Sequence, residues 1–413
     1  MSARKIKKFP FFVILLTFAL SSLSATIVFP ILAPLFLGSS GTIIRPEIPE
    51  TIRSILFGVF LTSFPLAQFL FAPLIGDYSD RNGRRRAFFI TLWLELIGYI
   101  LSGAGIQYHH LSLLFVGRFI TGLGAANFSV CLATLADISF DEKSKARYFS
   151  YGSAIAGVMF VFGPFIGGRL SDSSISPLFN FAFPLWVGGG LALLNIALIF
   201  LAFKETLLIK EDVTVDPIKA IHNIESAFKL DAIRTLYAVF FFFLFAWNML
   251  YQFLPALLVE EFNAKSSLIG DLTALMGIVW FVGTLVISFF LRFFDQQKRM
   301  LIVSLILFAV TVIFIPYPDK LSLFVLISSI TVFLAGGIWP ILIGTISKIS
   351  DPKAQGKTLG ISQSIQSLSM LLAPFFGGFF LQAHSKTPFI FASLSALIAI
   401  FFLTKLKSSF FKV

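Results

Sequence analysis

Charged residues and cysteine are both scarce in this sequence of 413 residues. Asp, Glu, Lys and Arg make up 13% of it, whereas a soluble protein carries about 25%. Hydrophobic residues make up 57%, which is more than a water-soluble core could bury. The single cysteine, Cys131, lies in an apolar run, which excludes disulfides and a cysteine metal site. A soluble enzyme is therefore excluded, and a membrane protein is expected.

Signatures of a bound cofactor are also missing. The sequence contains no P-loop motif, which argues against ATP as the energy source. Its four histidines have no cysteine or acidic partners at ligand spacing, so no metal site is expected. The net charge of +11 does not indicate nucleic acid, because the basic residues form short clusters between apolar runs. We expect no cofactor and no nucleic-acid partner, and an ion gradient as the energy source.

The apolar residues form runs of the length that a helix needs to cross a bilayer, about 20 residues. Twelve membrane-spanning helices are predicted, near 10–37, 52–75, 87–106, 111–135, 149–170, 181–203, 235–259, 267–291, 301–315, 321–346, 359–382 and 388–406. The first run imitates a signal peptide, but it stays apolar through Leu37, so we expect it to be retained. The predicted fold is an all-α polytopic protein in contact with membrane lipid.

Basic residues fix the expected orientation. Most Lys and Arg residues fall on one side of the membrane when the amino terminus is placed inside. The positive-inside rule then predicts that both termini are cytoplasmic. The expected location is the plasma membrane, which is the inner membrane if the cell is Gram-negative.

A weak internal repeat divides the chain in two. The segment Gly163–Gly168 recurs as Ala373–Gly378, which places span five over span eleven. An even number of spans restores orientation, so two parallel six-helix bundles are expected. The predicted domains are an amino-terminal bundle (1–203), a cytoplasmic linker (204–234) and a carboxy-terminal bundle (235–413).

The linker contains apolar residues at roughly helical spacing. These residues are Ile218, Ile221, Ile224 and Phe228. They predict an amphipathic helix on the inner membrane surface, with a docking site as the alternative.

The connection between spans two and three combines glycine, acid and arginine. It reads Gly76-Asp-Tyr-Ser-Asp80-Arg81-Asn-Gly83-Arg84-Arg85-Arg86. Gly83 can adopt a positive φ in a tight turn. Asp80 can accept hydrogen bonds from a helix amino terminus, and Arg84 can hold that carboxylate. The alternative is a plain positive-inside anchor, which is the role expected of Arg85 and Arg86.

This loop resembles the signature of the major facilitator superfamily, G-x-x-x-D-R-x-G-R-R. Tyr78 replaces the usual leucine, and the matching residues are Gly76, Asp80, Arg81, Gly83, Arg84 and Arg85. Span four contains a second match to the family, Arg118-Phe-Ile-Thr-Gly122-Leu-Gly124-Ala-Ala126. The resemblance covers the whole chain and implies alternating access, with the 76–86 loop as a gate.

Span five resembles the antiporter motif of drug–proton antiporters, through Gly163, Pro164, Gly167 and Gly168. Met159 stands where that motif has a further glycine. The nearest resemblance is to the tetracycline-type antiporters, which carry acids in spans one and three. The corresponding positions here hold Ser21 and Gly98.

Two charged residues, Glu95 and Arg118, lie deep in the predicted spans. A charge at that depth costs about 2.5–3.5 kcal/mol and so indicates a function. Glu95 lies one turn from Gly98 on the same helical face, so the acid has moved or the coupling differs. We predict that Glu95 carries a proton and that Arg118 couples proton and substrate movement. The alternative for Arg118 is a structural pairing that orients span four, and the alternative for Glu95 is a carboxyl that snorkels or pairs with a neighbour.

Uncharged polar and aromatic side chains in the spans predict an apolar cavity with few polar points, suited to an amphipathic organic molecule. The candidates are Gln68, Asn127, Asn248, Tyr251, Gln252, Trp280, Trp339, Gln363 and Gln366, together with Asn195 and Trp247. Each of them could instead form a hydrogen bond between helices.

The favoured function is proton-coupled export of a small amphipathic organic compound by a monomeric secondary transporter. The missing acid at Ser21 favours an alternative, a proton-coupled importer of a metabolite or chelator. A transporter-like receptor or lipid translocator is a third possibility. No enzymatic activity is expected.

Overall fold

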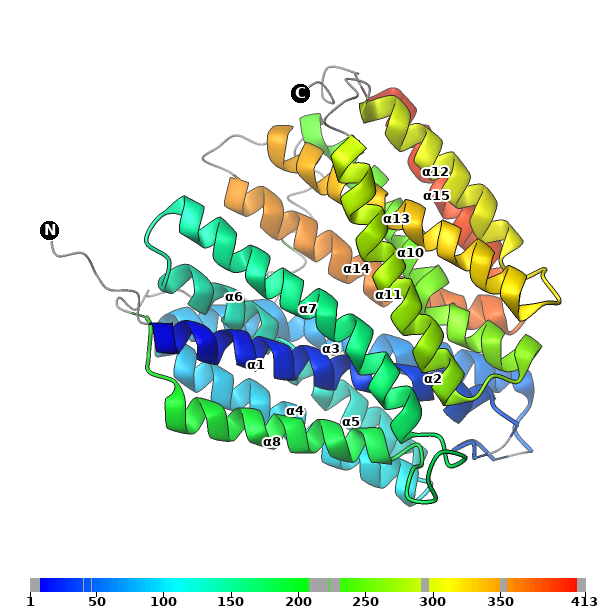
Figure 1. Ribbon diagram of the computed structural model, residues 1–413, viewed down its shortest axis with the longest axis horizontal. Helices are drawn as coiled ribbons and strands as arrows, with labels where there is room; N and C mark the ends of the chain where they lie inside the picture. The colour runs from blue at the N-terminus through cyan, green and yellow to red at the C-terminus, as the bar shows by residue number, and fades with distance from the viewer. Residues whose placement is uncertain are drawn as a thin grey trace, which may run out of the picture. The chain divides into compact units, whose positions relative to one another are not determined.

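The computed structural model describes residues 8–39, 41–45, 47–207, 222, 231–290, 297–349 and 355–406. In this part of the chain every regular element is a helix (Figure 1). Twelve described segments are long and apolar enough to cross a membrane, which confirms the predicted all-α, twelve-span fold. The apolar linker residues of the predicted amphipathic helix lie outside the described residues.

The chain forms two compact units. Unit 1 consists of Met1–Ile31 and Leu66–Lys219, and unit 2 consists of Leu32–Pro65 and Ala220–Val413. This grouping follows packing and differs from the division by internal repeat, which stays a prediction. The helices α2 (Phe29–Leu37) and α3 (Glu50–Asn82) have residues in both units.

The remaining helices each belong to one unit. Unit 1 contains α1 (Lys8–Ile27), α4 (Arg84–Gln107), α5 (Leu111–Gly124), α6 (Asn127–Asp137), α7 (Glu142–Leu170) and α8 (Phe183–Ala202). Unit 2 contains α10 (Asp231–Phe262), α11 (Ser266–Phe290), α12 (Gln297–Phe314), α13 (Leu321–Ile349), α14 (Gln355–Leu381) and α15 (Thr387–Lys405).

Unit 1 is held together by helices that pack at backbone distance. In Figure 1, α1 lies beside α7 and α8, and α4 lies beside α5. A β-carbon on Gly124 of α5 would lie 2.6 Å from the backbone nitrogen of Glu95 on α4. Small residues permit this approach, and close packing replaces the hydrophobic driving force that lipid does not supply. The α4–α5 contact therefore fixes the backbone that carries Glu95.

Two of the predicted spans are interrupted in the structure. Span one divides into α1 and α2 at Val28, and span four divides into α5 and α6 at Ala125 and Ala126. These two alanines have ψ angles of −11° and −10°, and Ala126 donates to the carbonyl of Leu123 three residues back. The short turn separates α6 from α5, and the first residue of α6, Asn127, points to Glu95 inside unit 1.

Unit 2 is built around α10, whose neighbours in the unit are α13, α14 and α15. Phenylalanines fill its interior, where Phe243 contacts Phe308 and Phe57 contacts Phe253 edge to face. Within this unit Gly58 of α3 lies against Gly378 of α14, and a β-carbon on Gly58 would meet the Gly378 Cα at 2.5 Å. Phe has no hydroxyl to satisfy, which suits it to a core facing lipid on one side.

The starts of α7 and α4 are stabilised in different ways. The side chain of Asp141 accepts from the backbone nitrogen of Ser144, and the Ser144 hydroxyl accepts from the backbone nitrogen of Asp141. This reciprocal capping box begins α7 locally. In α4 the residue before the helix is Gly83, which has no side chain to serve as a cap. The cap of α4 must therefore come from another part of the chain.

Candidate functional site

Glu95 is a buried acid near the middle of α4, with 2% of its surface exposed. The Ser24 hydroxyl donates to its Oε1 at 2.8 Å, and the Asn127 side-chain amide donates to its Oε2 at 3.3 Å. The two donors come from α1 and α6, on either side of the carboxylate. A carboxylate buried with two hydrogen-bond donors is a group that can exist charged inside a protein.

Ser21 lies at the centre of the same polar cluster. Its hydroxyl oxygen accepts from the amides of Asn127 at 2.7 Å and Asn195 at 3.1 Å. Asn195 of α8 also donates to the Thr17 carbonyl at 3.2 Å. Helices α1, α4, α6 and α8 therefore meet around Ser21 and Glu95. Glu95 of α4 thus contacts α1 within one turn of Ser21, the position at which the tetracycline-type antiporters carry an acid in span one.

Arg118 and Tyr99 extend this cluster along α4 and α5. Tyr99 lies one turn from Glu95 on α4 and interacts electrostatically with Glu95 and with Arg118. Tyr99 is fully buried, whereas Arg118 is partly exposed with a buried Nε atom. The cluster contains one carboxyl group, one guanidinium group and several hydroxyl and amide groups. Such a cluster can bind and release a proton.

The loop at the end of α3 folds around Arg84. Gly83 has a φ of 104°, as the sequence predicted for a tight turn. Arg84 is 5% exposed and holds Asp80 through Nη1, which also donates to Ser79 Oγ at 2.9 Å. Its Nε and Nη2 atoms donate to the two carboxylate oxygens of Asp137 at 2.7 and 3.1 Å. This fork ties the end of α6 to the start of α4.

Glu205, just after α8, supplies the cap that α4 lacks. Its Oε1 accepts from the backbone nitrogen of Arg84 at 3.0 Å, and its Oε2 accepts from that of Arg85 at 3.1 Å. Burial alone would raise the pKa of Glu205, but the backbone N–H groups of Leu207, Arg85, Arg84 and Thr206 hold it below its ordinary value. A carboxylate at a helix amino terminus is also favoured by the helix dipole. Thr206 Oγ1 donates to Asp137, which completes the cluster.

Sequence reasoning missed Asp137 and Glu205 as members of this loop cluster. Arg85, which was expected to be a plain anchor, donates to the carbonyl of Phe200 at 2.9 Å. Arg81 is exposed, and a β-carbon on Gly76 would meet nothing within 4 Å. No signal in the sequence pointed to Glu205, because its carboxylate comes to lie beside the start of α4 only once the helices pack together.

The glycines of the predicted antiporter motif pack against the end of α1. A β-carbon on Gly163 would lie 2.8 Å from Thr26 Cβ, and one on Gly167 would lie 2.7 Å from the Ile27 carbonyl carbon. Both contacts fall beside the break between α1 and α2. Gly168 is buried and Pro164 lies inside α7. The motif thus lets α7 approach α1 where α1 ends.

The predicted cavity residues separate between the two units. In unit 1, Gln68 donates to the Ala125 carbonyl at 3.4 Å, and Asn127 binds Glu95. In unit 2, Trp247 lies 4.3 Å from Trp280 and 5.6 Å from Tyr251, measured between ring centroids. These three partly exposed rings form an aromatic cluster.

The other polar candidates of unit 2 bond between helices or lie near the surface. Asn248 of α10 donates to Ser369 Oγ of α14 at 3.2 Å, and Gln252 donates to the Met370 carbonyl at 3.5 Å. Gln363 is exposed, while Gln366 and Trp339 are partly exposed. Asn248 and Gln252 therefore join α10 to α14, as the alternative interpretation allowed.

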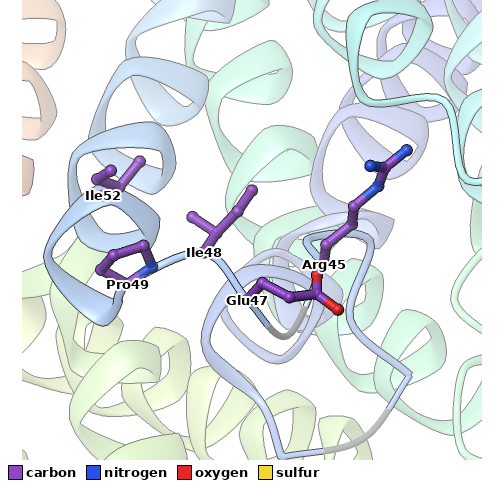
Figure 2. Close-up of a pocket in the computed structure, with 5 residues that line it drawn as sticks. All are labelled: Arg45, Glu47, Ile48, Pro49 and Ile52. Carbon is purple, nitrogen blue, oxygen red and sulfur yellow. The ribbon is translucent and has the colours of Figure 1, made fainter.

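A shallow open depression lies in the connection between α2 and α3. Figure 2 shows its lining residues, Arg45, Glu47, Ile48, Pro49 and Ile52. All of them come from one short stretch of chain, and none is among the predicted site residues. The lining residues belong neither to the acid cluster nor to the arginine loop.

The sequence matches a known family along most of its length. The Major Facilitator Superfamily profile matches residues 14–234 and 236–409. The chain belongs to the Major Facilitator Superfamily. It is accordingly a multi-pass membrane transporter and not an enzyme.

Curated relatives refine the comparison. The chain is 24% identical over 371 residues to the class H tetracycline resistance protein of Pasteurella multocida, covering 88% of this chain and 86% of that protein. It is 25% identical over 358 residues to multidrug resistance protein 2 of Bacillus subtilis, covering 83% and 84%. These similarities extend along most of both chains.

Solved structures of the superfamily share the fold. The crystal structure of a D-xylose-proton symporter superposes with a TM-score of 0.78 at 14% identity, over 98% of this chain and 99% of that one. The human organic anion transporter MFSD10 gives a TM-score of 0.67 at 20% identity, over 97% and 100%. At these identities the likeness concerns the fold alone.

Proposed function

We propose that this transporter exports a small amphipathic organic compound in exchange for protons. The observation that carries the proposal is the buried carboxylate of Glu95, held by donors from α1 and α6. A charge buried this deeply is costly to keep and is characteristic of proton carriers in transporters. The proton gradient supplies the energy, and no further cofactor is required.

Relatives support an organic substrate and an outward direction. Two of them carry names of resistance to tetracycline or to several drugs. A transporter would confer such resistance by moving the compound out of the cell. The aromatic cluster of Trp247, Tyr251 and Trp280 offers flat apolar faces to such a compound. The transporter works as a monomer in the plasma membrane, with both termini in the cytoplasm.

Transport proceeds by alternating access, and the 76–86 loop acts as the gate. In this proposal Asp80, held by Arg84, caps the start of α14 near Gln355 when the protein faces outward. The Arg84 fork to Asp137 and the Glu205 cap keep Asp80 at the end of α3. The gate thereby rests on a rigid base within unit 1.

Everted membrane vesicles that contain the full chain test the proposal. Respiration first acidifies the interior of the vesicles. Addition of tetracycline or of an amphipathic dye should then cause protons to leave the vesicle interior, as reported by a pH-sensitive fluorophore. Glu95→Gln should abolish that proton flux, whereas Glu47→Gln, in the exposed connection between α2 and α3, should not. Proton flux that survives in Glu95→Gln would overturn the role of Glu95.

Proton-coupled import of a metabolite or chelator is the second candidate, favoured by the serine at position 21 where antiporters carry an acid. It predicts the opposite direction of substrate movement. Uptake of a labelled compound into intact cells that stops when an uncoupler is added would establish import. Proton release from everted vesicles on substrate addition would establish export.

A further inference from the structure

The Ser24 hydroxyl has one hydrogen and two acceptors at hydrogen-bond distance, and the Tyr99 hydroxyl lies beside it. The Ser24 oxygen lies 2.8 Å from Glu95 Oε1 and 3.0 Å from the backbone carbonyl oxygen of Ser21. Ser24 is 1% exposed, so water does not compete for that hydrogen. A hydroxyl can rotate its hydrogen between acceptors and accept a hydrogen bond in return. Ser24 is therefore able to serve Glu95 both as a donor and as an acceptor.

The other oxygen of Glu95 has a different neighbour. Asn127 presents its amide nitrogen to Oε2, and a side-chain amide nitrogen donates but does not accept. The same nitrogen donates to Ser21 Oγ at 2.7 Å, which fixes the orientation of the amide. A proton on Oε2 would thus face another hydrogen, whereas a proton on Oε1 would face the Ser24 oxygen.

We propose that Ser24 is a positioning residue that lets Glu95 gain and lose a proton without leaving a buried hydrogen unpaired. This inference rests on the proposed role of Glu95 as the proton carrier. To that role it adds the atom that is protonated, Oε1 of Glu95, and the side chain that reorients when the proton binds, Ser24.

The exchange needs only one rotation. When Glu95 is charged, the Ser24 hydrogen points to Oε1. When a proton binds to Oε1, the Ser24 hydrogen turns to the Ser21 carbonyl, and the Ser24 oxygen accepts from the new O–H group. Asn127 continues to donate to Oε2, which remains the carbonyl oxygen of the acid. On release the proton leaves Oε1 and the Ser24 hydrogen returns.

Neighbouring titratable groups do not take over this role. On α4 the Tyr99 hydroxyl lies beside Ser24, and it interacts electrostatically with Glu95 and with Arg118 of α5. On α6 it is the buried thiol of Cys131. The described parts of α1 and α8 that pack here contribute Ser, Thr and Asn side chains, which do not titrate. Among the residues that the structure describes, the hydroxyl that donates to the carboxylate is that of Ser24.

Infrared difference spectroscopy of the purified full-length protein in lipid tests the proposal. The difference between acid and alkaline pH contains the C=O stretch of each carboxyl that is protonated, and Glu95→Gln identifies the band of Glu95. Ser24→Ala should shift that band toward the frequency of a free acid and slow proton-coupled transport about tenfold, since a hydrogen bond to a charged group is lost. Ser24→Thr keeps the hydroxyl and should restore both.

Ser22→Ala is the matched control, because Ser22 is a buried serine on the same helix outside the cluster. It should leave the band and the pH profile of transport unchanged. A Ser24→Ala protein with the wild-type band and pH profile would overturn the proposal. If Ser24→Ala does not fold, Ser24→Cys replaces it, because a thiol is a weaker hydrogen-bond partner than a hydroxyl. A shift of the band in Ser24→Cys supports the proposal, and an unshifted band overturns it. Persistence of the band in Glu95→Gln instead refutes the role of Glu95 itself.

Discussion

Gly98 of α4 lies so close to Thr121 of α5 that a β-carbon at position 98 would stand 2.5 Å from the Thr121 backbone nitrogen. The sequence resemblance places an acid of span three at this position, and no side chain fits there. Glu95, one turn earlier, is directed between α1 and α6, where Ser24 and Asn127 hold its carboxylate. The packing of α4 on α5 therefore accounts for the displaced acid.

Gly98→Ala should destabilise the protein by about 1–3 kcal/mol, because the added methyl group forces two backbones apart. Gly190→Ala is the control in α8, where a β-carbon would meet nothing within 4 Å. That substitution should be neutral or stabilise by up to about 1 kcal/mol through helix propensity. Thermal unfolding of both variants in the same detergent measures the difference. Equal melting temperatures would contradict the backbone contact.

Gly167→Ala should slow transport and lower thermal stability, because its methyl group would meet the carbonyl of Ile27 at the end of α1. Gly157→Ala, ten residues earlier on the same helix, is the control, since open space surrounds that position. A cost of about 1–3 kcal/mol is expected for Gly167→Ala alone. Parallel melting and vesicle assays check this, and similar behaviour of the two variants would show that α7 does not need the glycine.

The fold was predictable because hydropathy alone marks helices that cross a membrane, and all twelve spans were found this way. The pairing of Asp80 with Arg84 was also predictable, since residues four apart lie on one helical face or turn. The interruption at Ala125 and Ala126 was not, because neither alanine disfavours a helix. That interruption orients Asn127 toward Glu95, whereas the sequence suggested a substrate contact for Asn127.

The partners Asp137 and Glu205 could not be predicted for a different reason. They lie far from Arg84 in the sequence, and no periodic pattern connects them to it. Only the packing of α6 and α8 around α4 brings their carboxylates to the same turn. The sequence indicated that the arginine loop contacts helix ends, but not which ends.

Glu205→Gln should destabilise the start of α4 at neutral pH. The wild-type carboxylate accepts hydrogen bonds from two backbone N–H groups, and in the variant the side-chain NH₂ would face one of them, which would lose its acceptor. The folded-state pKa of Glu205 lies below its ordinary value, since backbone N–H groups outweigh burial. The stabilisation is therefore complete above the unfolded pKa, about 4.3, and is lost as pH falls through the lower folded value.

Melting temperatures of the wild type and of Glu205→Gln, measured from pH 8 to pH 3, check this dependence. Their difference should stay constant down to about pH 5 and shrink at more acidic pH. Glu47→Gln, at an exposed position between α2 and α3, serves as the control. A difference that instead shrinks between pH 8 and pH 6 would show that a group other than Glu205 is responsible.

Asp80→Asn tests the gate. Asp80 is held by Arg84, yet 36% of its side chain is exposed, compared with 17% for Asp137. Asp80 is therefore accessible to a second helix end, whereas Asp137 is more buried and binds Arg84 inside the cluster. A charged contact at a helix terminus contributes about 0.3–1 kcal/mol, and up to about 2 kcal/mol when partly buried. Such a contribution biases a two-state equilibrium without locking it.

Removal of the Asp80 charge should lower turnover about fivefold and shift the population toward the inward-facing state, with little change in substrate affinity. Spin labels at Lys143→Cys and Lys348→Cys, in a Cys131→Ser background, report the distance between the two units. Arg86→Gln, an exposed residue of the same loop, should leave the distances unchanged. Asp137→Asn should reduce thermal stability instead, because it breaks the fork to a buried arginine. If Asp80→Asn alters neither the distances nor the transport rate, the loop only anchors the helices and the gate lies elsewhere.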